Sequence, residues 1–281
     1  MKQVVISVLI VLIAVLGNAQ INKHVVYKQV EAVKLTMDIY FPDYLDTTDT
    51  YPAMVFYSGG GWRILKDNQF EFQAKYFASK GIVCFLANYR VSSRNQTSPI
   101  ESLEDAKSAI RYVREHSEEF HIDTAKIVAS GGSAGGHLAA ATALVKKFND
   151  NIDDLEVSCK PNALILFNPV LDNGPGGSGY DRIGDKYKDF SPLHNIKKGA
   201  PPTIVFLGTK DEYIPVVTTQ YYKMVMEKVG SRCDLKLYDG EGHGFFNHNR
   251  IENYKRTVFE AHEFLYSLGY LHDYPNMEEI K

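Results

Sequence analysis

A serine enclosed by glycines, Gly131-Gly132-Ser133-Ala134-Gly135, lies between an apolar run and a helix-forming run. Residues 127–130 predict a buried strand, and residues 134–148 predict a helix. A turn this tight leaves no space for side chains on either side of the serine, so glycine is needed there. The layout is that of a nucleophile elbow, which holds a serine hydroxyl at the edge of a sheet and the N-terminus of a helix. The pattern therefore predicts a strand–helix fold and a reactive serine, Ser133.

Strand and helix signals alternate along the chain from about residue 33. Strands are expected at residues 33–41, 53–57, 82–87, 127–130, 162–167, 203–207 and 234–238, and helices at 70–80, 102–118, 134–148, 216–229 and 251–268. Repeated strand–helix–strand units imply an α/β fold with a mostly parallel central sheet and helices on both faces. We therefore expect one catalytic domain over residues 20–281. Residues 172–200, rich in Gly, Asp, Lys and Tyr, are expected to form an insertion over the sheet edge.

The N-terminus carries a separate signal. A basic Lys2 precedes the nearly apolar residues 4–16, and Gly17-Asn18-Ala19 supplies small residues before Gln20. This order predicts a secretory signal peptide over residues 1–19, and hence an exported protein that is periplasmic or secreted. The apolar stretch is short for a membrane-spanning helix, so no membrane insertion is expected after cleavage, with an uncleaved anchor as the alternative.

Composition limits the partners and cofactors. A net charge of −3 favours neither a nucleic acid nor an anionic membrane surface as a partner. Three widely spaced cysteines, Cys84, Cys159 and Cys233, form neither a disulfide framework nor a zinc site. Buried thiols are expected, with one bridge left open in an exported protein. The glycine runs lack P-loop and dinucleotide spacing, so we expect no cofactor and no metal. The sequence carries no signal for an oligomeric state.

The serine needs a general base within hydrogen-bond reach, and an imidazole performs that role near neutral pH. His243 is the favoured candidate, because it lies in the glycine-rich loop of residues 239–246, directly after the last predicted strand. Flanking glycines allow such a loop to bring the imidazole over the sheet edge. His137 follows the elbow too closely and is expected to lie on the helix.

A carboxylate should orient the imidazole and stabilise its cation. Asp211 follows the predicted strand at residues 203–207, and the chain order serine, aspartate, histidine is the one expected for this type of elbow. Asp172, after the preceding strand, is the alternative. Asp239 and Glu241 are weaker alternatives, because both lie in the loop of the histidine itself.

Acyl transfer also needs hydrogen-bond donors for the developing oxyanion. The run Ser58-Gly59-Gly60-Gly61-Trp62 follows a buried strand and offers unobstructed backbone N–H groups. We expect the oxyanion hole to consist of the N–H groups of Gly60, Gly61 and Ala134, the last being the residue after the nucleophile. Trp62 either forms a wall of the acyl pocket or packs in the core.

Six motifs occur in one order along the chain. They are Gly59-Gly60-Gly61-Trp62, Asn88-Tyr89-Arg90, Asp105-Ala106-Lys107, Gly131 to Leu138, Gly208-Thr209-Lys210-Asp211 with Ile214-Pro215, and Gly242-His243-Gly244-Phe245. With these motifs the chain resembles serine esterases and lipases of the α/β-hydrolase fold, near the hormone-sensitive-lipase-like and the acetylxylan- and feruloyl-esterase-like groups. The resemblance implies a cofactor-free serine esterase, often one that trims acyl groups from polysaccharides.

The chain departs from that family at one position. Related esterases usually have histidine before the three glycines, whereas this chain has Ser58. The family histidine generally braces the loop, so the departure puts the rigidity of the loop in question.

The expected substrate follows from what covers the site. About 30 residues separate the predicted cleavage point from the first buried strand, so no large cap domain is expected. Residues 172–200 are polar and glycine-rich, unlike an amphipathic lid. We expect an open cleft for short acyl groups, acetyl before feruloyl, on a carbohydrate or polysaccharide alcohol. The alternatives are a prolyl-oligopeptidase-like peptidase, a lipase acting on longer acyl chains, and a non-catalytic binding protein on the same fold.

Overall fold

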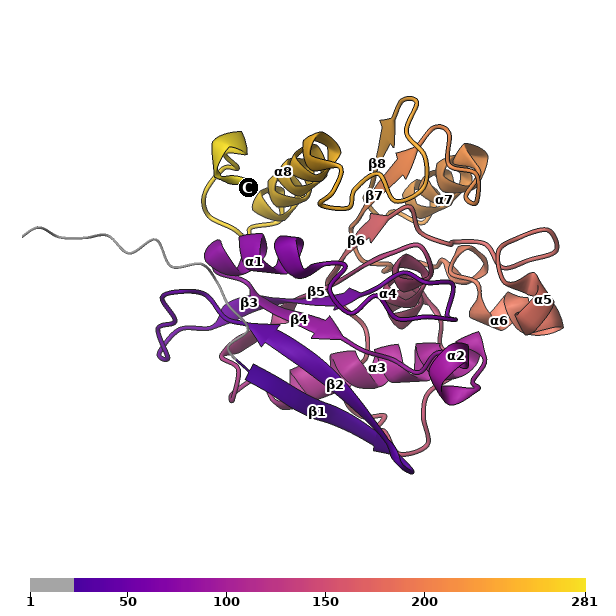
Figure 1. The fold of residues 1–281 in the computed structure, drawn as a ribbon, viewed down its shortest axis with the longest axis horizontal. Coiled ribbons are helices and arrows are strands. Elements are labelled where there is room, and N and C mark those ends of the chain that lie inside the picture. Colours follow the sequence, from indigo (N-terminus) through magenta and orange to yellow (C-terminus); the bar gives the residue numbers. More distant parts are fainter. Residues whose placement is uncertain (1–22) are drawn as a thin grey trace, which may run out of the picture.

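An eight-stranded sheet runs through the computed structural model, which describes residues 23–281 (Figure 1). The strands lie in the order β1-β2-β4-β3-β5-β6-β7-β8. β1 pairs with β2, and β2 with β4, in the antiparallel direction, whereas all other neighbours are parallel. The predicted α/β fold with a mostly parallel sheet is therefore confirmed.

The elements follow the predicted alternation. The strands are β1 (Lys23–Val30), β2 (Val33–Tyr40), β3 (Tyr51–Tyr57), β4 (Val83–Ala87), β5 (Ile122–Gly132), β6 (Ala163–Phe167), β7 (Thr203–Gly208) and β8 (Cys233–Tyr238). The helices are α1 (Glu71–Ser79), α2 (Ser92–Asn95), α3 (Pro99–Glu115), α4 (Ala134–Leu144), α5 (Tyr180–Ile183), α6 (Tyr187–Phe190), α7 (Val216–Lys228) and α8 (Ile251–Ser267). Short 3-10 turns occupy Gly184–Lys186, Leu193–Asn195 and Met277–Glu279.

Several elements differ from the predictions: β5 begins at Ile122 rather than at residue 127, and the short helices α2, α5 and α6 were not predicted. β1 was not expected, because a register shift between Val26 and Lys28 breaks the period-two alternation of this edge strand. α3 begins at Pro99 rather than near residue 102, since Ser98 and Glu101 form a capping box before the apolar stripe. α4 ends at Leu144, where the chain turns extended, rather than at residue 148.

The sheet is buried on both faces, as the continuous apolar run of β3 predicts. On one face, Val55 and Tyr57 pack in the cluster that includes residues of α3, α4 and α7. On the other, Met54 and Phe56 pack in the cluster that includes residues of α1 and α8. Figure 1 shows α1 and α8 on the opposite side of the sheet from α3. This two-sided cover leaves the strand ends as the place where loops meet.

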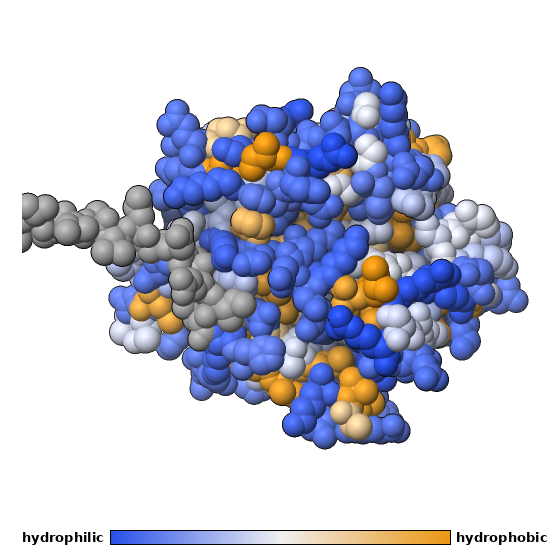
Figure 2. All heavy atoms as spheres, viewed as in Figure 1, coloured by the Kyte–Doolittle hydropathy of each residue, from blue (hydrophilic) through white to orange (hydrophobic). Residues whose placement is uncertain are grey.

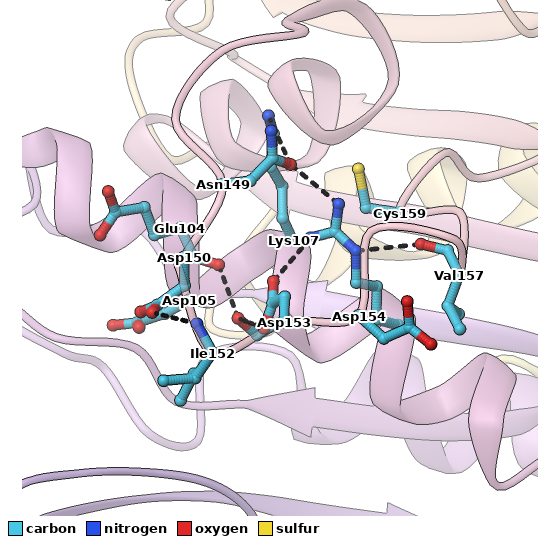
Figure 3. Close-up of polar contacts among 12 residues, drawn as sticks. Glu104, Asp105, Lys107, Asn149, Asp150, Ile152, Asp153, Asp154, Val157 and Cys159 are labelled. Carbon is cyan, nitrogen blue, oxygen red and sulfur yellow. Dashed lines mark hydrogen bonds and ion pairs between the residues drawn. The ribbon is translucent and has the colours of Figure 1, made fainter.

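Buried ion pairs attach α3 to its neighbours. The Asp105 carboxylate, whose side chain is fully buried, accepts hydrogen bonds from Lys28 Nζ at 2.7 Å and from Arg90 Nε at 2.8 Å. Arg111 donates to Asp153 at 2.6 Å and to Asn149 at 2.8 Å, which ties the loop after α4 to the same helix (Figure 3). Arg90 and Asp105, which belong to two of the six sequence motifs, thus form a buried ion pair. Removing either partner would leave a buried charge uncompensated.

The signal peptide predicted for residues 1–19 lies outside the described residues and stays a prediction. Within residues 23–281, none of the helices combines the length and the apolar composition that a membrane crossing requires. All three cysteines are free thiols; Cys84 and Cys233 are buried and Cys159 is half-buried.

Candidate active site

Ser133 lies at the sharp turn between β5 and α4, in a backbone conformation that costs energy. Its φ of 55° and ψ of −119° fall outside the regions that L-residues favour, at a cost of about 1–3 kcal/mol. The Ser133 N–H donates to the Phe167 carbonyl at 3.0 Å, and the Val170 N–H donates to the Ser133 carbonyl at 3.1 Å. A Cβ on Gly135 would lie 2.0 Å from the carbonyl oxygen of Tyr57. Gly135 thus lets α4 approach β3 closely. The hydrogen bonds to Phe167 and Val170 hold the strained serine from the side of β6.

Asp211 and His243 form a buried hydrogen-bonded pair. His243 Nδ1 lies 2.8 Å from Asp211 Oδ2, and the Asp211 side chain is fully buried. Asp211 Oδ1 accepts the backbone N–H groups of Tyr213 and Ile214, each at 2.9 Å. Burial alone raises the pKa of Asp211, but the bonds from His243, Ile214 and Tyr213 outweigh it and hold that pKa below its usual range. A carboxylate here fixes the proton on Nδ1, so that Nε2 is left as a proton acceptor.

The other carboxylates considered for this role lie elsewhere. Asp172 accepts a hydrogen bond from the backbone of its own turn, at Gly174. Asp239 accepts the Thr209 hydroxyl at 3.0 Å. Within residues 23–281, neither these two nor Glu241 hydrogen-bonds to the histidine side chain.

Asn168, which sequence reasoning passed over, lies at the end of β6 and reaches the loop of the histidine. Its side-chain Oδ1 accepts the Gly244 N–H at 2.8 Å, and its Nδ2 lies 3.5 Å from His243 Nε2. Its φ of 33° is positive, as expected for an asparagine at a sharp turn after a strand. A polar residue at the carboxyl end of a parallel strand was the signal that could have identified it.

A cleft of about 440 Å³ opens at this edge of the sheet, within the usual size range for small-molecule sites. Ser133 and His243 line it together, although the structure shows no hydrogen bond between their side chains. Such bonds are often long in the unliganded enzyme and tighten when substrate binds. The lining residues are Gly59, Gly60, Gly61, Trp62, Lys66, Gln69, Ser133, Ala134, Asn168, Val170, Ser178, Gly179, Arg182, Tyr213, Ile214, His243, Gly244, Phe246 and Asn247.

Gly60 and Gly61 adopt conformations that only glycine accepts readily, with φ of 139° and 63°. The Gly60 carbonyl accepts the N–H groups of Arg63 and Ile64, which closes a tight turn beside Ser133. A Cβ on Gly60 would lie 2.1 Å from the Ile64 carbonyl oxygen. In the described chain the N–H groups of Gly60 and Gly61 have no internal acceptor. Both glycines also line the cleft.

Comparison with known proteins agrees with this geometry. The family model named BD-FAE matches residues 37–173, and that of the dienelactone hydrolase family matches residues 184–266. Esterase 2 of Thermogutta terrifontis, solved after phosphoramylation by tabun, is 43% identical and superposes with a TM-score of 0.86, covering 89% of this chain and 96% of that one. This chain belongs to the α/β-hydrolase esterases.

Curated relatives match more distantly. The acetylxylan esterase of Xylanibacter ruminicola is 28% identical over 214 residues, which are 69% of this chain and 41% of the relative. The probable carboxylic ester hydrolase LipM of Mycobacterium tuberculosis is 30% identical over 203 residues, 64% of this chain and 46% of the relative. The chain thus spans less than half the length of these two relatives.

Ser58, which replaces the histidine of the usual esterase motif, forms hydrogen bonds that hold the glycine loop. The Tyr89 hydroxyl donates to the Ser58 carbonyl at 2.6 Å, and Ser58 Oγ accepts the Lys66 N–H at 3.3 Å. The loop is therefore attached at both ends of its turn without a histidine. Tyr89 belongs to the motif that also supplies Arg90 to the ion pairs of α3.

A pair of amide side chains links the glycine loop to the histidine loop. Gln69 Oε1 accepts the Gly59 N–H at 2.6 Å, and Gln69 Nε2 donates to Asn247 Oδ1 at 3.0 Å. Asn247 Nδ2 donates in turn to the Gly244 carbonyl at 2.7 Å. Three hydrogen bonds thereby link the glycine loop to the histidine loop.

Trp62 both lines the cleft and packs in the hydrophobic core. Its ring packs edge-on against His137 with centroids 5.1 Å apart. Burial lowers the pKa of His137 to about 3, so this imidazole stays neutral over the physiological range. His137 is buried on α4 and supports the wall of the cleft, as its position directly after the elbow predicts.

The amide bridge predicts the effect of a remote substitution. Replacing Gln69 with methionine removes the acceptor of Gly59 and the link to Asn247 while keeping the side-chain length. We expect kcat for a p-nitrophenyl ester to fall about tenfold with little change in KM, because misplaced donors weaken transition-state binding more than substrate binding. Gln29→Met, at an exposed position of the edge strand β1, is the matched control. An unchanged kcat for Gln69→Met would show that the bridge does not position the donors.

Proposed function

We propose that this chain is an exported serine esterase that removes short acyl groups, acetyl above all, from a carbohydrate or polysaccharide. One observation carries the proposal. Ser133, on a strained turn, shares a cleft with His243, whose Nδ1 is hydrogen-bonded to the buried Asp211. Gly60 and Gly61 offer free N–H donors in the same cleft. Nucleophile, base, orienting carboxylate and oxyanion donors are the parts that acyl transfer requires.

In the proposed reaction Ser133 Oγ attacks the ester carbonyl while His243 Nε2 takes the hydroxyl proton. The N–H groups of Gly60, Gly61 and Ala134 stabilise the resulting oxyanion, and each such donor lowers the barrier by about 2.7–4 kcal/mol. His243 then donates the proton to the leaving alcohol. Water, activated by the same imidazole, releases the acyl group from the serine. Asp211 stabilises the imidazolium in both halves of the reaction.

The relatives support the choice of short acyl groups. The Thermogutta terrifontis esterase has been solved with propionate bound, at 42% identity and a TM-score of 0.86, and with butyrate bound. It has also been solved phosphorylated by paraoxon. A curated relative is an acetylxylan esterase. Because the cleft of this chain is small and edged by amide and cationic side chains, we assign it an acyl group of similar size.

The carbohydrate alcohol is proposed from the surroundings of the base. Tyr213 is 63% exposed, lines the cleft, and stands edge-on to His243 with ring centroids 4.9 Å apart. His243 protonates the leaving alcohol, so this exposed ring lies on the leaving-group side, where its apolar face can cover a sugar ring. The face drawn in Figure 2 is mostly hydrophilic, and its hydrophobic residues form separate groups.

Replacing Ser133 with alanine tests the nucleophile. Alanine keeps the Cβ and removes only the hydroxyl, so Ser133→Ala should fold normally and lose all but a trace of p-nitrophenyl acetate hydrolysis. Ser130→Ala is the control, since it removes a buried hydroxyl three residues earlier on the same strand that has no hydrogen-bond partner in the structure. Turnover by Ser133→Ala at the wild-type rate would refute the assignment.

A substrate series tests the acyl group and the alcohol. We expect kcat/KM to be highest for p-nitrophenyl acetate and to decline through the butyrate and octanoate esters, because most residues that line the cleft are glycines or polar side chains. Acetylated xylan should release acetate measurably, with the same polymer after chemical deacetylation as the blank. A preference for octanoate would favour a lipase instead, and hydrolysis of aminoacyl anilides in place of esters would favour a peptidase.

A further inference from the structure

The cleft is lined by an arginine from the insertion. Arg182 comes from α5, in the insertion between β6 and β7, and lines the same cleft as Ser133. Its guanidinium lies over the ring of Trp62, 5.2 Å from the ring centre. Gly179 makes room for this contact, because a Cβ there would lie 3.0 Å from the Trp62 ring and 3.8 Å from Arg182 Nη2. The arginine is therefore packed against the wall of the cleft rather than extended into solvent.

The guanidinium has donors that nothing in the described chain satisfies. Arg182 Nε and Nη1 are both shielded from solvent and have no hydrogen-bond partner. No carboxylate within residues 23–281 forms an ion pair with Arg182; the adjacent Asp181 lies instead 3.8 Å from Arg63. Desolvation and the nearby charge of Arg63 lower the pKa of Arg182, and the opposing effect of Asp181 does not outweigh them. Buried donors left unpaired are costly, so an acceptor on a ligand in this cleft would relieve that cost.

The charge of the residues that line the cleft also favours an anionic ligand. Lys66 is the second cation among its lining residues, and no aspartate or glutamate is among them. The whole chain, by contrast, carries a net charge of −3. A cleft with two cations and no carboxylate attracts anions. A carboxylate is one of the anionic groups that a planar guanidinium binds best, because the two groups form two parallel N–H···O bonds.

We propose that Arg182 binds a carboxylate carried by the ester substrate, so that the natural substrates are acidic esters. The inference rests on the proposed esterase function of the same cleft and adds to it the charge of the substrate. The carboxylate could belong to the acyl group, as in a hemisuccinate, or to the alcohol, as in an acetylated acidic sugar. The recognition chemistry is the same in both, and the test separates them.

Two matched substrate pairs test the proposal at neutral pH. The acyl-side pair is p-nitrophenyl hydrogen succinate and its neutral methyl ester. The alcohol-side pair is 3-acetoxybenzoate and its neutral methyl ester. The quantity measured is the ratio of kcat/KM for the anionic ester to that for its neutral partner, compared between enzymes so that intrinsic reactivity cancels. Arg182→Gln should lower this ratio about tenfold or more in one pair, and the pair that responds identifies the side that carries the carboxylate.

Arg63→Gln is the control. This arginine is 64% exposed, lies near the same helix and carries the same charge, but it does not line the cleft. For Arg63→Gln, the ratio of kcat/KM for the anionic ester to that for the neutral ester should stay within about twofold of wild type, because screened surface charges act weakly. Arg182→Lys, which keeps the charge but not the fork, should also lower the ratio, and it serves if the glutamine variant does not fold.

The outcomes separate the two proposals. Unchanged ratios in both pairs for the Arg182 variants, with the esters still hydrolysed, would overturn the carboxylate site and leave the esterase function intact. An equal fall for Arg63→Gln would show a general field effect and would also overturn it. Failure of the wild-type protein to hydrolyse any of the four esters would instead overturn the proposed function.

Discussion

The strained backbone of Ser133 is the constraint on which the site depends. Its positive φ is kept because the Phe167 carbonyl and the Val170 N–H hold it from the β6 side, while Gly135 lets α4 approach β3 without a side chain in between. Hydrophobic packing on both faces of the sheet stabilises that arrangement. The energy stored in the turn is small beside the burial that supports it, and it places the hydroxyl clear of the sheet.

The parallel strands then bring four further loops to the same edge. The loop after β3 carries the glycine donors, and the loop after β6 carries Asn168. Those after β7 and β8 carry Asp211 and His243. Because these segments are loops, hydrogen bonds between them set their separation: Gln69 and Asn247 connect the loops after β3 and β8, and Asn168 connects the loops after β6 and β8. The order of the strands therefore brings the loops to one edge of the sheet, and these few hydrogen bonds set their positions there.

The sequence was sufficient for the fold class and for bringing Ser133, Asp211 and His243 together, because each follows a strand and carries its own local pattern. It was not sufficient for Gln69, which contacts Asn247 across 178 positions of chain, since no local pattern marks such a contact. Arg182 was hidden for a similar reason: only its packing on Trp62 distinguishes it from a solvated charge. The edge strand β1 was missed because a bulge disturbs its alternation. Local sequence patterns were therefore enough for residues that follow a strand, but not for contacts between residues that are distant along the chain.

Mass spectrometry of the protein after inhibition by paraoxon tests the central claim most directly. The account predicts one phosphoryl adduct per chain, on the peptide that contains Ser133, with esterase activity lost in proportion to its formation. An adduct on another residue, or full inhibition without any adduct on that peptide, would contradict it.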